Sequence, residues 1–226
     1  MTVKAEWDQL IRNLIAEGVL KSPNIIRAMR QVSREPFLPE HMKQSHAIDA
    51  PLPIGWGQTA SAPHMVSIMN EALQLEVGEK ILEVGAGSGW HACTIAEIIA
   101  PSDQPKHTWG LVYTAEIIRD LADYARTNIE KTGFADRVTI MHHDGSQGYL
   151  AEAPYDRILV TAAAPDVPKP LTDQLKPDGG ALVIPVGDTY YYQTLYRITK
   201  RDTRLIREDL GGVAFVPLTG KYGHHT

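Results

Sequence analysis

Two short segments of the chain carry side chains that could do chemistry. Residues 55–64 (GWGQTASAPH) hold an amide, two hydroxyls and an imidazole: Gln58, Thr59, Ser61 and His64. Residues 81–89 (ILEVGAGSG) are an apolar run followed by alternating glycines. A glycine-rich turn between a strand and a helix lets the backbone approach a nucleotide-like ligand. Together the segments predict a cofactor site with a substrate held above it, which indicates an enzyme.

The glycine turn is a weak signal by itself, because glycines also permit tight packing of a helix on a strand. A dinucleotide-binding fingerprint would place its third glycine one position later, where this chain has Trp90. The pattern therefore disfavours a hydride-transfer enzyme.

Three carboxylates fall near the ends of successive predicted strands: Glu83, Glu116 and Asp144. Each alone could be a helix cap or a solvated loop acid. In this position Glu116 could accept hydrogen bonds from ribose hydroxyls, and Asp144 could accept one from an adenine amino group. The acids would repel a pyrophosphate, whereas S-adenosylmethionine has no phosphate and carries a sulfonium cation. They favour that cofactor.

Hydrophobic periodicity predicts the elements that must position these groups. Helices are expected over residues 5–20, 22–32, 63–73, 90–100, 117–131 and 168–175, with Ser61 as a cap for the third. Strands are expected over residues 80–84, 111–115, 138–141, 157–162, 181–186, 194–199 and 204–216, the last two antiparallel. The prolines between residues 36 and 53 indicate an extended, irregular segment.

Alternating strands and helices predict an α/β fold with a doubly wound, mixed but mostly parallel, seven-stranded Rossmann-like sheet and an N-terminal helical extension. We expect one domain over residues 1–226. Within it, residues 1–76 would form the N-terminal helices and a substrate-covering segment, and residues 77–218 the cofactor-binding core and C-terminal strands. The ligand should lie at the carboxyl ends of the strands.

Composition narrows the function classes. The 226 residues carry a net charge of −5, which argues against a dedicated nucleic-acid binder. The single cysteine, Cys93, permits no intramolecular disulfide and lies in an apolar stretch typical of a buried thiol. No signal peptide or membrane-spanning run is seen, so a cytoplasmic protein without membrane contact is expected. We expect no metal site, and we expect the tail from Lys221 to Thr226, with His224 and His225, to fray.

Several blocks, in order, resemble the protein-L-isoaspartate O-methyltransferase family. They are residues 53–65 (PIGWGQTASAPHM), 82–89 (LEVGAGSG), 112–116 (VYTAE), 144–145 (DG), 155–165 (YDRILVTAAAP), 175–177 (LKP) and 215–218 (FVPL). The resemblance covers most of residues 32–218. The segment 58–64 is specific to this family, whereas the glycine turn is shared by methyltransferases in general. Ala60 and Trp90 depart slightly from the family pattern, and Ala60 could loosen the substrate pocket.

The resemblance implies methyl transfer from S-adenosylmethionine to the free α-carboxyl of L-isoaspartyl residues in damaged proteins and peptides, leaving S-adenosylhomocysteine. The ester would then cyclise to a succinimide without the enzyme. By resemblance, Ser61 is the catalytic residue that hydrogen-bonds the substrate carboxylate. The substrate-binding set would be Ile54, Gly55, Thr59, Ser61, Val216 and Leu218. The cofactor-binding set would be His64, Glu83, Gly85, Gly87, Ser88, Glu116, Asp144 and Gly145, although His64 could instead pack on its helix.

This chemistry asks little of the protein. The acceptor carboxylate, with a pKa of roughly 4, is ionised at neutral pH and needs no general base. No His–Asp or Cys–His pair is evident in the sequence, which agrees with this mechanism. We expect backbone recognition of the substrate, because many flanking sequences must be accepted, and a monomeric enzyme.

Other functions stay open. The same fold could methylate a carboxyl of one dedicated peptide. Base methylation of nucleic acid would be marked by an Asn/Asp-Pro-Pro-aromatic motif, but residues 161–165 read TAAAP. Metal-dependent catechol-type methylation would need more carboxylates than Asp144 and Asp166 supply. A non-catalytic binding module is disfavoured by the hydroxyls of residues 54–64.

Overall fold

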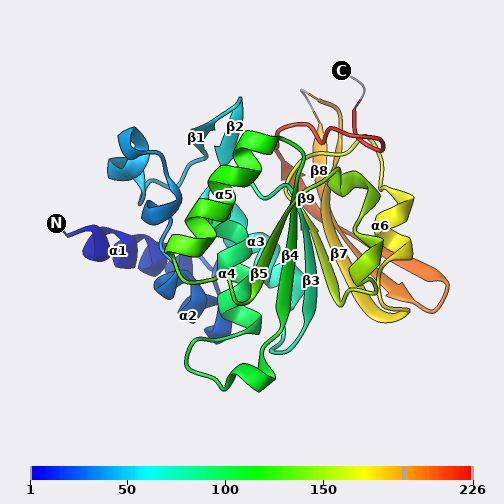
Figure 1. The fold of residues 1–226 in the computed structure, drawn as a ribbon, viewed down its shortest axis with the longest axis horizontal. Helices are drawn as coiled ribbons and strands as arrows, with labels where there is room; N and C mark the ends of the chain where they lie inside the picture. The colour runs from blue at the N-terminus through cyan, green and yellow to red at the C-terminus, as the bar shows by residue number, and fades with distance from the viewer. Residues whose placement is uncertain (1, 190–191, 225–226) are drawn as a thin grey trace.

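A seven-stranded β-sheet organises the chain (Figure 1). The computed structural model describes residues 2–189 and 192–224. The strands are β3 (Lys80–Val84), β4 (Leu111–Glu116), β5 (Val138–His142), β6 (Arg157–Val160), β7 (Asp178–Gly187), β8 (Gln193–Arg201) and β9 (Arg204–Val213). Their order is β5-β4-β3-β6-β7-β8-β9. The first five run parallel, and β8 and β9 are antiparallel to their neighbours. The predicted fold class is confirmed, and β5 and β9 are the two edge strands.

Helices cover both faces of this sheet. They are α1 (Val3–Ala16), α2 (Pro23–Gln31), α3 (Pro63–Leu73), α4 (Trp90–Ile99), α5 (Arg119–Lys131) and α6 (Lys169–Asp173). The larger core joins Ile81 of β3 to side chains of α1 to α5. The smaller core joins Leu82 and Val84 to Leu171 of α6. Successive residues of β3 thus face opposite sides of the sheet, as strand geometry requires.

The helix preceding the glycine turn starts differently from the sequence expectation. The residue before α3 is Ala62, whose side chain makes no capping hydrogen bond. The expected cap at Ser61 is therefore wrong. Pro63 at the first helical position needs no capping partner, because it has no N–H group. The hydroxyl of Ser61 is free of that role.

The proline-rich segment contains more structure than the sequence indicated. It forms two 3₁₀ turns, η1 (Glu35–Phe37) and η2 (Glu40–Ser45), followed by a hairpin of β1 (Leu52–Gly55) and β2 (Gln58–Ala60). The hairpin turns at Trp56, whose φ of 51° lies between glycines at 95° and 72°. Its strands are only four and three residues long, too short for a readable alternation.

The C-terminal segment is ordered where the sequence indicated fraying. The N–H groups of Lys221 and Tyr222 donate to Asp144 Oδ2 (2.9 Å) and Ser146 Oγ (3.1 Å). The N–H of His224 donates to the carbonyl of Leu218 (2.8 Å). The expectation of a frayed tail is wrong over residues 221–224, and His225 and Thr226 lie outside the described residues.

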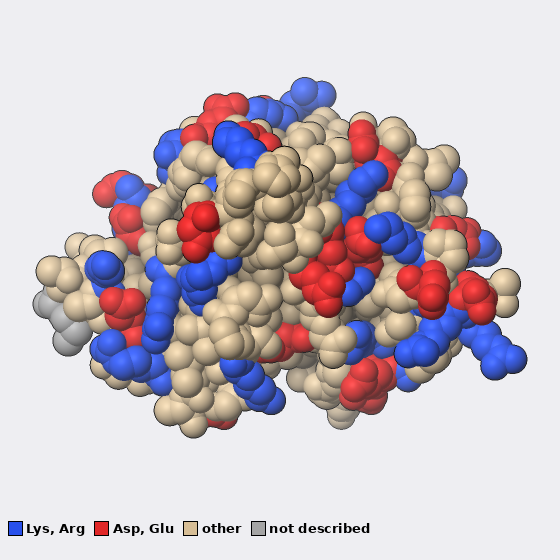
Figure 2. Space-filling model, turned by 90° about the horizontal axis from the view of Figure 1, so that it is seen from below, with Lys and Arg blue, Asp and Glu red and all other residues tan. Residues whose placement is uncertain are grey.

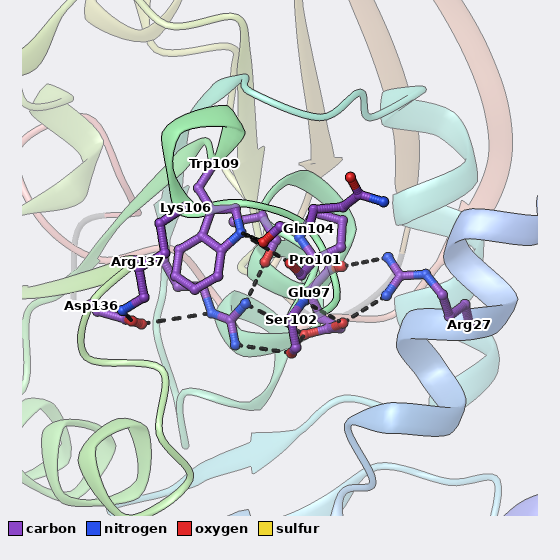
Figure 3. Close-up of polar contacts among 10 residues, drawn as sticks. Arg27, Glu97, Pro101, Ser102, Gln104, Lys106, Trp109, Asp136 and Arg137 are labelled. Carbon is purple, nitrogen blue, oxygen red and sulfur yellow. Dashed lines mark hydrogen bonds and ion pairs between the residues drawn. The ribbon is translucent and has the colours of Figure 1, made fainter.

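At the amino ends of the strands, an ion network ties α2 to α4 (Figure 3). Arg27 of α2 donates to Glu97 of α4 at 2.7 Å, and Arg137 lies 3.6 Å from the same carboxylate. Seen from that end, in Figure 2, acidic and basic side chains are intermixed.

Among the described residues, no helix is long and apolar enough to cross a membrane. Within residues 2–189 and 192–224, no three His, Cys, Asp or Glu side chains lie close enough together to hold a metal ion.

Candidate active site

A cavity of about 300 Å³ lies at the carboxyl ends of β3, β4 and β6, where the fold predicts a ligand. Its volume lies at the lower end of the range of small-molecule sites. A larger hollow of about 850 Å³, bounded by residues 212–217 and the start of α3, adjoins it. Ser61 and Thr59 line both spaces. A group held in one space can therefore reach a group held in the other at these hydroxyls.

Nine of the sequence-predicted residues line the cavity: Thr59, Ser61, Gly85, Gly87, Ser88, Glu116, Gly145, Val216 and Leu218. Five do not: Ile54, Gly55, His64, Glu83 and Asp144. Residues that no sequence signal singled out complete the wall, including Val66 of α3, Leu121 of α5 and Thr219. They come from elements far apart in the sequence.

The glycine turn needs its glycines for space as well as conformation. Gly85 has a φ of 94°, and a Cβ there would overlap the hydroxyl of Thr161. That hydroxyl donates to the carbonyl of Gly85 at 2.7 Å, so the residue that follows β6 holds the turn in place. At Gly145 a Cβ would lie 2.7 Å from Val84 Cγ1. At both Gly85, after β3, and Gly145, after β5, it is therefore backbone that borders the cavity.

Among the described residues that line the cavity, Glu116 is the only Asp, Glu, Lys or Arg, and the only other titratable side chain is an imidazole. Its Oε2 accepts the N–H of Gly87, and its Oε1 accepts the N–H of Ile118, each at 3.1 Å. Burial raises the pKa of this carboxyl, and the backbone donors oppose that rise. A wall that holds one carboxylate and neither Lys nor Arg suits a cation without phosphates, so these residues fit S-adenosylmethionine.

Glu83 points away from the cavity. Like Ile81 it faces the larger core, and its side chain has no exposed surface. Oε2 accepts the hydroxyl of Thr114 at 2.5 Å, while Oε1 has no hydrogen-bond partner among the described residues. Burial raises its pKa to about 8. The structure does not bring this carboxyl to the cofactor cavity.

Asp144 lies behind the cavity wall. Its Oδ1 accepts the N–H and the hydroxyl of Ser146 (3.0 and 2.6 Å), and its Oδ2 accepts the N–H of Lys221 (2.9 Å). Burial alone would raise the pKa of Asp144, but these hydrogen bonds more than offset it and lower the pKa. The carboxylate is thereby committed to the C-terminal segment, and only Gly145 reaches the cavity from this turn.

His64 lines the larger hollow, and it has a partner that the sequence did not reveal. Asp49 Oδ1 accepts the backbone N–H of His64 at 2.9 Å and lies 3.0 Å from its Nδ1. No His–Asp pair is evident in the sequence, and the structure forms one between these two residues. Asp49 lies in an irregular segment fifteen residues upstream, where no periodic pattern marks it.

Of the other residues predicted to bind substrate, some line the cavity and others do not. The Ile54 side chain is buried in a small cluster with Leu52 and Ala60, and Gly55 belongs to the hairpin turn. The carbonyl of Val216 and the N–H of Leu218 already pair with Ala163, at 2.8 and 2.7 Å. The N–H of Val216 donates to none of the described residues.

Comparisons with known proteins point to one family. A sequence profile described as protein-L-isoaspartate(D-aspartate) O-methyltransferase matches residues 5–223. The chain is similar to proteins named protein-L-isoaspartate O-methyltransferase. The one from Hyperthermus butylicus is 54% identical, covering 95% of this chain and 89% of the relative. The one from Korarchaeum cryptofilum is 50% identical, covering 95% and 97%.

Solved structures agree. A protein-L-isoaspartate O-methyltransferase from Plasmodium falciparum, crystallised with S-adenosylhomocysteine, superposes with a TM-score of 0.80 and 29% identity. The match covers 94% of this chain and 98% of that one. A profile match over nearly the whole chain, relatives at half identity and a cavity suited to the cofactor all agree. The chain therefore belongs to the protein-L-isoaspartate(D-aspartate) O-methyltransferase family.

Proposed function

We propose that the chain transfers a methyl group from S-adenosylmethionine to the free α-carboxyl of L-isoaspartyl residues in proteins and peptides. The observation that carries the proposal is the position of Ser61, which lines both the cofactor cavity and the larger hollow. Residues 77–218 hold the cofactor, and residues 1–76 supply the segment that covers the substrate.

On the cofactor side, the backbone of Gly85, Gly87 and Ser88 approaches the ligand closely, and Glu116 accepts ribose hydroxyls. Gly145 lies against the adenine end. Asp144 acts indirectly. It accepts a hydrogen bond from the C-terminal segment, and Thr219 of that segment lines the cavity. The cofactor supplies an electrophilic methyl on a sulfonium, and the single carboxylate of the wall is compatible with that positive charge.

On the substrate side, the Ser61 hydroxyl donates to the acceptor carboxylate and orients one oxygen toward the methyl. Thr59 lies beside it, and the Val216 N–H binds the peptide main chain. The carboxylate is already ionised, so the residues orient and desolvate it rather than remove a proton. Such orientation contributes on the order of 7 kcal/mol to catalysis. His64 and Asp49 are not needed as a general base.

Main-chain recognition accounts for a broad range of substrates. The described lining of the larger hollow holds no Lys, Arg, Asp or Glu, so it selects weakly among charged flanking residues. We expect a single chain to suffice, because both binding spaces are formed by one protomer.

The decisive assay measures transfer of labelled methyl from S-adenosylmethionine to an isoaspartyl peptide and to the aspartyl peptide of the same sequence. We expect base-labile label on the isoaspartyl peptide only. Labelling of neither peptide, with S-adenosylhomocysteine still bound in calorimetry, would favour a dedicated peptide substrate. Failure to bind S-adenosylhomocysteine would overturn the proposal itself.

A further inference from the structure

Arg34 is a buried cation that the proposed chemistry leaves unexplained. Its side chain has no exposed surface, yet it forms no ion pair within 4 Å of a described carboxylate. Burial lowers its pKa to about 10, and the charge of Asp49 opposes that fall. The guanidinium is still charged at neutral pH. A buried charge without a close counter-ion is costly, so its hydrogen bonds must stabilise something specific.

All of its donors go to backbone carbonyls. Nε and Nη2 donate to His46 (3.2 and 3.1 Å), Nη2 also to Ile48 (2.6 Å) and Ser45 (3.5 Å), and Nη1 to Ala50 (2.8 Å). Residues 46–51 belong to no helix or strand, so their carbonyls have no regular partners. A planar fork of five N–H groups can satisfy such a set, whereas a lysine, with three donors on one atom, cannot.

The sixth contact reaches the active site. Arg34 Nη1 also donates to the carbonyl of Ser61 at 3.2 Å. The same guanidinium lies 5.7 Å from the ring centroid of Trp90, which lines the cofactor cavity at the start of α4. Arg34 therefore touches both the acceptor segment and a wall of the donor cavity.

Residues 45–50, whose carbonyls accept hydrogen bonds from Arg34, form a loop that supplies a second anchor for the segment containing Ser61. Asp49, within that loop, accepts the backbone N–H of His64 in the first turn of α3. Ser61 is thus held from both sides: its own carbonyl is bonded to Arg34, and the backbone three residues later is bonded to Asp49. The first anchor is Arg34 itself, and the second lies in residues 45–50, whose carbonyls Arg34 bonds.

We propose that Arg34 is a positioning residue for methyl transfer, which holds Ser61 in register with the methyl donor through the 45–50 loop and the Ser61 carbonyl. The inference rests on the proposed function, because it requires Ser61 to contact the acceptor carboxylate. It predicts that disturbing Arg34 lowers turnover more than it lowers binding of the cofactor.

The test compares two identical substitutions. Arg34→Lys alters the acceptor anchor, while Arg137→Lys alters another buried arginine at the far end of the sheet (6% exposed; Figure 3). For each we would measure kcat and KM with an isoaspartyl peptide, the Kd of S-adenosylhomocysteine by calorimetry, and Tm. Since misplacement by about 1 Å can cost 10²-fold in rate, we expect Arg34→Lys to lower kcat about 10- to 100-fold. Its Kd should change less than about threefold, and Arg137→Lys should keep kcat despite a lower Tm.

A double substitution tests whether Arg34 acts through Ser61. In a Ser61→Ala background, Arg34→Lys should cost little further activity, because residues acting through one another are not additive. Additive losses would overturn the inference, as would an unchanged kcat in Arg34→Lys or parallel losses of kcat and cofactor affinity. If Arg34→Lys does not fold, Asp49→Ala tests the second anchor, with a several-fold lower kcat and unchanged Kd expected. An unchanged kcat in that variant would overturn the inference.

The two proposals fail separately. A wild-type chain that does not methylate the isoaspartyl peptide contradicts the proposed function. An active wild type whose Arg34→Lys variant keeps full kcat contradicts only the role of Arg34.

Discussion

The two ends of the β-sheet treat a fully buried carboxylate in opposite ways. At the amino end, Glu97 accepts from Arg27 (2.7 Å) and from the N–H and hydroxyl of Ser102 (3.2 and 2.5 Å). Toward the carboxyl end, Glu83 has one hydroxyl donor and an oxygen without a partner among the described residues. Glu97 is satisfied by arginines, a backbone N–H and one hydroxyl, whereas Glu83 is left with an oxygen that has no donor among the described residues.

The same contrast holds for the buried arginines. Arg137 combines a carboxylate with stacking on Trp109, 4.6 Å from the ring centroid (Figure 3), and on Phe134, 4.4 Å from the ring centroid. Arg34 donates to backbone carbonyls instead, most of them in residues 45–50 and one at Ser61, which lines the site. The amino end is thus organised for stability, and the carboxyl end positions backbone and hydroxyls for a ligand. The predictions below separate these two roles.

The largest effect should come from the amino end. Glu97→Ala leaves two arginines without their buried partner, and breaking such a pair costs about 3–5 kcal/mol. Denaturant unfolding should show this loss, while kcat of the folded fraction stays within a factor of two, since the network is remote from the cavity. A loss below about 1 kcal/mol would show that the network contributes little.

Ser61→Ala should reverse that pattern. We expect kcat to fall about 100-fold, equivalent to about 2.7 kcal/mol, because one donor to the reacting carboxylate is lost. Calorimetry should show S-adenosylhomocysteine bound as in the wild type. Equal weakening of cofactor binding would show that Ser61 does not face the acceptor.

Glu116→Gln tests the cofactor wall. The amide keeps an acceptor but loses the charge, and charge-assisted hydrogen bonds are roughly twice as strong as neutral ones. We expect S-adenosylhomocysteine to bind about tenfold more weakly, with kcat at saturating cofactor little changed. An unaltered Kd would remove Glu116 from the ribose site.

Asp144→Ala should act more weakly and indirectly. Loss of the bonds to Ser146 and Lys221 loosens the C-terminal segment, and we expect cofactor affinity to fall about threefold, in the range of one exposed hydrogen bond. Hydrogen exchange at residues 219–224 should rise in parallel. Weaker binding without faster exchange would instead indicate direct contact between Asp144 and adenine.

The smallest effect on activity is expected for Glu83→Gln, because this side chain does not line the cavity and its role should be seen in stability instead. The folded-state pKa of about 8 lies above the ordinary 4.5, so the folded protein binds a proton that the unfolded chain has lost. Wild-type stability should therefore fall as pH rises from about 4.5 through 8, and the variant should remove that slope. Denaturation across this range checks the sign, and a stability that rises with pH would contradict it.

Much of the fold could be predicted because its signals are local. The run ending at Val84 and the glycines from Gly85 determine a strand and a turn within nine residues. Elements β3 to β9 and α2 to α5 were expected within a few residues of their bounds. The hairpin β1–β2 was missed, because its few residues carry no period.

The sequence by itself determined the fold class, the family and the residue types available to the cofactor, since periodicity and motif spacing are properties of neighbouring residues. Tertiary structure alone decided which groups meet. It turned Glu83 into the core, committed Asp144 to residue 221, paired Asp49 with His64 and directed Arg34 to Ser61. The last three contacts join residues 15 to 77 positions apart, where side-chain direction follows from packing and from the need to satisfy buried backbone groups.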